Sequence, residues 1–179
     1  HEHTGSWFWW GQNLCTAADY KALWRMTYER MQENGATQLL YAYSPGTEPK
    51  DSTAYLERYP GDDIVDLIGV DAYQFDREAY VQSLDNALRI MEQVGKAHQK
   101  AIAVTETGYE TIPDSLWWTQ TLMPVVEKYP VSYVLVWRNA RERENHYYAP
   151  YPGHPSAADF VNFYNDPRTL FAGDMKTIK

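Results

Sequence analysis

Residues 77–105, REAYVQSLDNALRIMEQVGKAHQKAIAVT, carry the clearest structural signal in the chain. Apolar residues recur at intervals of three and four up to residue 99, which predicts an amphipathic helix. The short apolar run at residues 101–105 then predicts a buried strand. A helix that leads directly into a buried strand is the repeating unit of an alternating α/β fold, so this stretch decides the fold class.

The same alternation extends to both sides of this unit. Strand patterns centre near positions 40, 67, 103 and 134. Successive strands therefore lie about thirty residues apart, which is typical of βα units that build a parallel sheet. The remaining strands are expected at 38–43, 64–70 and 131–137, and the helices at 17–34, 52–58, 77–99, 114–128 and 157–164.

Two architectures fit this alternation. A doubly wound sheet suits 179 residues, but it normally carries a Gly-rich phosphate loop after an early strand, and the sequence has none. A (β/α)₈ TIM barrel places catalytic groups at the C-terminal ends of its strands, where Glu2, Asp71, Glu106 and Arg138 fall. A whole barrel needs about 250 residues, so we expect the end of strand 4 through strand 8 and the last helix.

The predicted half barrel accounts for residues 1–179 as one catalytic unit, with no second domain. Residue 1 already lies in what reads as the end of a strand and is not Met, so we expect the N-terminal half of the barrel upstream. The formal charge of -8 argues against nucleic acid or an anionic membrane as a partner. The sequence contains no apolar run long enough to span a membrane, and its single cysteine, Cys15, excludes an internal disulfide.

Two glutamates are the best indication of function. Glu2 and Glu106 each end a strand-like stretch among aromatic residues. Hydrolysis of a glycosidic bond requires two carboxyl groups, because one protonates the leaving oxygen while the other attacks the sugar or activates water. Two other interpretations stay open: the aromatic residues at 7–10 could be core packing, and Glu106 could form a buried ion pair with Arg138.

A metal site is a further alternative, because His1 and His3 form an H-x-H pair that would point to one side of an extended strand. Such a site would need additional ligands at the ends of the later strands. Those ends instead carry Tyr43, Asp71, Glu106 and Trp137. We therefore predict no metal and no cofactor.

Five segments, HEHTGSWFWWG, GVDAY, TETGYE, VLVWRNA and FYNDPRTLF, resemble glycoside hydrolase family 26 in their order and spacing. The best-known members of that family are endo-β-1,4-mannanases. The resemblance implies a (β/α)₈ barrel in which Glu2 is the acid/base and Glu106 is the nucleophile. It also implies a sugar site lined by His1, Trp7, Tyr73, Trp137 and Arg138 and supported by Asp71.

The resemblance further implies retaining hydrolysis of β-1,4-mannosidic bonds in mannan, glucomannan or galactomannan. A same-family activity on β-1,3-xylan or mixed-linkage β-glucan is the alternative within enzymes. A carbohydrate-binding protein is the alternative outside them, although such modules are usually β-sandwiches rather than βα repeats. The partners would be β-mannan and the N-terminal half of the barrel, in an extracellular, periplasmic or cell-surface location.

Overall fold

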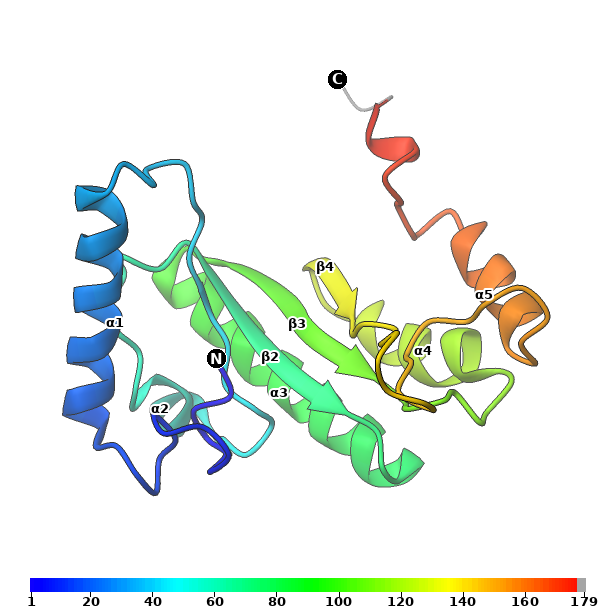
Figure 1. Cartoon of the computed structure of the whole chain (residues 1–179), viewed down its shortest axis with the longest axis horizontal. Helices are drawn as coiled ribbons and strands as arrows, with labels where there is room; N and C mark the ends of the chain where they lie inside the picture. The colour runs from blue at the N-terminus through cyan, green and yellow to red at the C-terminus, as the bar shows by residue number, and fades with distance from the viewer. Residues whose placement is uncertain (177–179) are drawn as a thin grey trace.

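A sheet of four parallel strands forms the centre of the computed structural model, which describes residues 1–176 (Figure 1). Its strands are β1 (Ala42–Tyr43), β2 (Leu67–Tyr73), β3 (Ala101–Gly108) and β4 (Val131–Val136). They lie side by side in the order β1-β2-β3-β4. The strand order of a doubly wound sheet reverses at a switch point, whereas barrel strands follow one another in sequence order. The observed order therefore favours the barrel.

Helices alternate with these strands, as the sequence predicts. They are α1 (Ala17–Glu33), α2 (Ser52–Leu56), α3 (Arg77–His98), the π-helical turn η1 (Trp118–Leu122), α4 (Met123–Val126), α5 (Ala157–Tyr164) and the short 3₁₀ turn η2 (Asp174–Lys176). In Figure 1, α3 runs along one face of β2 and β3, and α1 and α5 lie at opposite ends of the sheet. Within residues 1–176, every helix is too short or too polar to cross a membrane.

The core lies between α3 and the two central strands. Leu84 and Leu88 of α3 have no exposed surface, and neither do Ile68, Val70 and Val104 of β2 and β3. The apolar stripe that predicts α3 from the sequence is thus the face that the helix buries against the sheet. Asp76 caps this helix by accepting a hydrogen bond from the backbone N–H of Ala79 at 2.9 Å.

The strand predicted at 64–70 is displaced toward the C-terminus, because β2 spans Leu67–Tyr73. Ile64 and Val65 are buried, but both precede the strand: Ile64 ends a turn in which its N–H donates to the carbonyl of Gly61, and Val65 follows that turn. Burial in a turn and burial in a strand give the same apolar pattern, so the sequence alone could not separate them.

The strand predicted at 38–43 is shorter than expected, since only Ala42 and Tyr43 pair with β2. At the preceding residue, the backbone N–H of Tyr41 donates to the side chain of Asp66 at 2.8 Å. A carboxylate oxygen therefore replaces the carbonyl that would have continued the ladder.

The helix predicted at 114–128 is replaced by η1 and α4, which begin only at Trp118. Asp114 does not cap a helix but accepts from the N–H of Leu116, two residues on. The amides of Trp118 and Thr119 instead donate to the buried carboxylate of Asp159, at 3.0 and 3.1 Å. A residue of α5 thus fixes where this helix begins.

Gly69 of β2 offers a test of how tightly the sheet is packed. A Cβ at this position would lie 2.4 Å from Cγ2 and Oγ1 of Thr105, whose hydroxyl is 2.6 Å from that of Ser44. We expect Gly69→Ala to lower the free energy of unfolding by about 1–3 kcal/mol through overpacking. Gly173→Ala is the control, because a Cβ there meets no atom within 4 Å. Equal midpoints for the two variants in urea denaturation would contradict this packing.

Candidate active site

The C-terminal ends of β2 and β3 bring together residues that are far apart in sequence. Their register places Asp71 opposite Glu106 and Tyr73 opposite Gly108. The register shifts between Val70 and Asp71, because Thr105 is an extra residue on β3. Such bulges redirect side chains and are common beside active sites, and nothing in the sequence pattern announces this one.

Glu106 lies at the centre of the group, with 14% of its side chain exposed. Its Oε2 accepts a hydrogen bond from the Tyr73 hydroxyl at 2.6 Å, and its Oε1 is 3.8 Å from Nδ1 of His1. Burial raises the pKa of Glu106, as do the nearby charges of Asp71 and Glu2, while the Tyr73 bond and His1 lower it. The protein thus holds a partly desolvated carboxylate whose charged form depends on two specific partners.

Glu2 is attached to the end of β1 through its backbone N–H, which donates to the carbonyl of Ser44 at 2.8 Å. It has a φ of 44°, a left-handed conformation that is uncommon outside glycine and that marks functional sites. Its Oε2 accepts from Nε1 of Trp7 at 3.0 Å. The residue before it, His1, contacts both Asp71 and Glu106, and the negative charge of Glu2 contributes to raising the pKa of Glu106.

His1 completes the contacts of this site. Its Nδ1 is 3.4 Å from Oδ2 of Asp71, which is 5% exposed. The hydrogen bond to Asp71 raises the pKa of His1, with further contributions from the charges of Asp71, Glu106 and Glu2. The backbone carbonyl of His1 also accepts from Nε1 of Trp10 at 3.0 Å. Asp71 therefore contacts His1 from β2, and the supporting role that the family resemblance implies for it stays a prediction.

His3 does not join His1 in a metal site. It is 2% exposed and packs between Tyr20 and Tyr43, with ring centroids 4.6 and 5.0 Å away. Burial lowers the pKa of His3 to about 3, so its ring is neutral. The H-x-H alternative is wrong because one imidazole is enclosed in the core while the other faces the carboxylates.

A different set of donors could still accommodate a cation. One nitrogen of His1 and one oxygen each of Asp71 and Glu106 lie within 4.8 Å of one another. The family resemblance assigns the same three residues to the sugar site. A hydrogen bond with Asp71 already orients His1, and a hydrogen bond from Tyr73 orients Glu106. The absence of a metal stays a prediction.

The aromatic run after Glu2 is divided between core and surface. Trp7 and Trp9 are 72% and 64% exposed, whereas Phe8 and Trp10 are partly buried and stack at 4.3 Å. Trp7 and Trp9 are therefore not packed into the core of residues 1–176, and a sugar-binding role of Trp7 stays a prediction. An exposed indole that also donates to Glu2 suits contact with a ligand at the site.

Arg58 anchors this aromatic segment and was not singled out by the sequence. It is 6% exposed, and its Nη2 donates to the carbonyls of Gln12, at 3.3 Å, and Cys15. Its guanidinium also lies 5.6 Å from the ring centroid of Tyr20. Nothing near it in sequence could have revealed these contacts, because the two carbonyls lie 46 and 43 residues away and the ring of Tyr20 is also distant in sequence.

Trp137 and Arg138 follow β4 beside the end of β3, where the N–H of Trp137 donates to the carbonyl of Thr107 at 2.9 Å. The side chain of Arg138 is half exposed and pairs with Glu142 at 2.6 Å. Arg138 thus pairs with Glu142 and not with Glu106, and the buried ion-pair interpretation of Glu106 is wrong. A sugar-binding role of Trp137 and Arg138 stays a prediction.

Tyr148 is a site residue that sequence reasoning missed. Its ring lies 5.6 Å from that of Tyr73 and is packed so closely on Gly108 that a Cβ there would meet Tyr148 Cδ1 at 2.3 Å. Asn139 holds this loop, since its Oδ1 accepts from the amides of Tyr148 and Ala149, both at 2.9 Å. The Tyr-rich composition of the loop was visible, but its return onto β3 was not.

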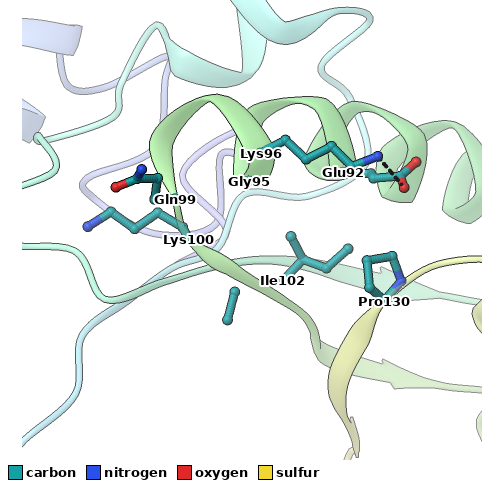
Figure 2. A pocket seen from close by; sticks show the side chains of 8 residues that line it. Glu92, Gly95, Lys96, Gln99, Lys100, Ile102 and Pro130 are labelled. Atoms are coloured by element: carbon teal, nitrogen blue, oxygen red, sulfur yellow. Dashed lines mark hydrogen bonds and ion pairs between the residues drawn. The ribbon is translucent and has the colours of Figure 1, made fainter.

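A separate hollow of about 320 Å³ lies at the opposite end of β3 (Figure 2). It is lined by residues of the α3 end and the strand start, among them Lys96, Lys100, Ile102 and Pro130. Lys96 is already paired with Glu92 at 2.8 Å. The hollow lies away from the carboxylates and contributes nothing to their chemistry.

The variant Tyr73→Phe tests whether the hydrogen bond from the Tyr73 hydroxyl keeps Glu106 ionised. The Tyr73 hydroxyl lowers the pKa of Glu106, so its removal raises that pKa and leaves the carboxylate protonated up to a higher pH. In the complete catalytic protein, we expect the acidic limb of the kcat/KM profile to move to higher pH and kcat/KM to fall about 10- to 100-fold. Tyr28→Phe removes a hydroxyl from α1 as a control. An acidic limb that stays in place would refute the role of Tyr73.

Comparison with known proteins identifies similar chains. Residues 1–165 match the family model described as glycosyl hydrolase family 26. A GH26 β-mannanase structure from Bacteroides ovatus is 61% identical over 97% of this chain, with a TM-score of 0.95. A modular endo-β-1,4-mannanase from Cellulomonas fimi is 32% identical over 97%, with a TM-score of 0.85. A mannan endo-1,4-β-mannosidase from Bifidobacterium adolescentis is 30% identical over 96%.

The chain spans only part of each of these relatives. It covers 51% of the Bacteroides ovatus structure, 41% of the Cellulomonas fimi structure and 19% of the Bifidobacterium adolescentis protein. The agreement with solved mannanases confirms the predicted (β/α)₈ fold class, of which this chain supplies one part.

Proposed function

Because the chain belongs to glycosyl hydrolase family 26, we propose that it is the C-terminal half of a catalytic barrel that hydrolyses β-1,4-mannosidic bonds. The substrates are mannan, glucomannan or galactomannan. One observation carries the proposal: the carboxylate of Glu106 accepts from Tyr73 at 2.6 Å, in a site that it shares with His1, Asp71 and Glu2. Two carboxyl groups in one site are what glycoside hydrolysis requires.

In the first step, an oxygen of Glu106 bonds to the anomeric carbon while the glycosidic bond breaks. Glu2 donates its proton to the departing oxygen. Tyr73 and His1 keep Glu106 ionised and oriented for attack, because both lower its pKa against the effect of burial. We expect the two carboxyl groups to be about 5–5.5 Å apart, as in retaining enzymes.

In the second step, Glu2 accepts a proton from water, the water oxygen bonds to the anomeric carbon, and the bond to Glu106 breaks. Two successive inversions give overall retention of configuration. Trp7, Trp137 and Tyr73 line the pyranose, and their contacts favour the distorted transition state over the ground state.

The N-terminal half of the barrel is the proposed structural partner. Tyr133 and Leu135 of β4 are 44% and 41% exposed, although side chains of barrel strands are normally covered on both faces of the sheet. Three further barrel strands and their loops would cover such surfaces and add sugar contacts. We place the protein outside the cytoplasm, in an extracellular, periplasmic or cell-surface location, because a mannan polymer is too large to cross a membrane.

The decisive experiment for the proposed function is product analysis of the complete protein on mannan, β-1,3-xylan and mixed-linkage β-glucan side by side. The expected result is manno-oligosaccharides from mannan and little release from the other two polymers. Proton NMR during the first minutes should show the β-anomer before mutarotation. An α-anomer would contradict double displacement, and binding without cleavage would support a carbohydrate-binding protein instead.

A further inference from the structure

Phe75 is the most exposed large apolar side chain in residues 1–176, at 93%. It comes two residues after Tyr73, whose hydroxyl bonds to Glu106. The loop after β2 therefore carries an exposed phenyl ring at the same end of the sheet as Tyr73 and Glu106. Single exposed apolar residues are common, so exposure alone would mean little.

The backbone around Phe75 is unusually well fixed for an exposed loop. Gln74 is 5% exposed, its N–H donates to the carbonyl of Gly108 at 2.9 Å, and its Oε1 accepts from Nε1 of Trp117 at 2.8 Å. On the other side, Asp76 caps α3 through the N–H of Ala79. Phe75 thus lies between two residues whose backbone is fixed by hydrogen bonds. Ligand binding would therefore cost little conformational entropy in this loop.

The position of Phe75 in the sheet separates it from other exposed apolar residues. Leu135 belongs to β4, at the edge of the four-stranded sheet described in residues 1–176. Phe75 follows β2, which is paired on both sides, with β1 and β3. A missing neighbouring strand therefore accounts for the exposure of Leu135, whereas Phe75 lies in a loop after a strand that already has both of its neighbours.

We infer that Phe75 is a sugar-binding residue that stacks on a mannose unit of the polysaccharide, at a subsite beyond those that flank the scissile bond. The inference rests on the proposed function. A pyranose presents an apolar face of C–H groups, and a flat aromatic ring covers such a face without needing a charge. The substrate class is a β-linked hexose chain long enough to reach from Glu106 past the end of β2.

Chain length of the substrate tests this inference in the complete catalytic protein. With Phe75→Ala, we expect kcat/KM to fall roughly three- to tenfold on long manno-oligosaccharides and mannan, in line with the strength of an aromatic contact. On the shortest oligosaccharide that is cleaved, kcat/KM should not change. Phe75→Trp should retain activity on long chains, and Tyr164→Ala, an exposed ring on α5, should leave every substrate unaffected.

Each other outcome overturns the inference. An equal loss on short and long substrates would place Phe75 in support of the chemistry, and no loss on any substrate would leave it without a binding role. A lower melting temperature for Phe75→Ala than for the unmodified protein would show that another protein segment covers the ring. Failure of the proposed function itself is distinguishable, because the unmodified protein would then cleave no mannan.

Discussion

Replacing Glu106 with Gln is expected to reduce kcat on mannan by about four orders of magnitude or more, which is the scale seen when a nucleophile is removed. The amide has nearly the shape of the carboxylate and still offers Tyr73 an oxygen acceptor. It cannot form the covalent bond to the anomeric carbon. The rate should be measured on soluble mannan, together with far-UV circular dichroism to confirm that the fold is retained.

Glu110→Gln is the matched control for this variant. Glu110 lies four residues further along the chain, is half exposed and pairs with His146 at 2.7 Å. The same chemical change at this position should leave kcat unchanged. Retention of more than about one hundredth of the activity by Glu106→Gln would exclude it as the nucleophile.

Replacing Glu2 with Gln is expected to lower kcat on mannan by about 10²- to 10⁴-fold, the usual contribution of a general acid and base. The amide oxygen can still accept from Nε1 of Trp7, so the aromatic segment should keep its position. The loss should depend on the leaving group. An aryl β-mannoside, whose leaving oxygen needs little protonation, should still form the sugar–enzyme bond.

Added azide tests the general-base role of Glu2 in the Glu2→Gln variant. Azide needs no general base, so it should attack the accumulated intermediate, restore turnover of the aryl substrate and yield a β-mannosyl azide. Glu29→Gln on the exposed side of α1 should show no azide effect. Equal losses on mannan and on the aryl substrate, with no rescue, would mean that Glu2 is not the acid/base.

The elements that the sequence predicted best are those whose periodicity reflects one continuous buried face. The helix expected at 77–99 is α3, Arg77–His98, and the helix expected at 157–164 is α5, Ala157–Tyr164. The proximity of Tyr73 and Glu106 was predictable too, because parallel strands bring their C-terminal ends to the same edge.

Three of the errors originate in side chains that act on residues distant in sequence. Asp159 sets the start of η1 from forty residues away, and Asp66 ends the pairing of β1. Tyr148 reaches the site through a loop that Asn139 closes. Local patterns report burial and propensity, whereas these contacts exist only once the chain is folded.

The most direct test of the account is to identify the residue that becomes bonded to the sugar. A 2-fluoro mannosyl fluoride slows both steps but has an excellent leaving group, so the covalent intermediate accumulates. Digestion and mass spectrometry of the treated protein should find the sugar on Glu106, in the peptide that contains TETGYE. A label on Asp71 or Glu2, or an unlabelled protein that releases the inverted product, would contradict the account.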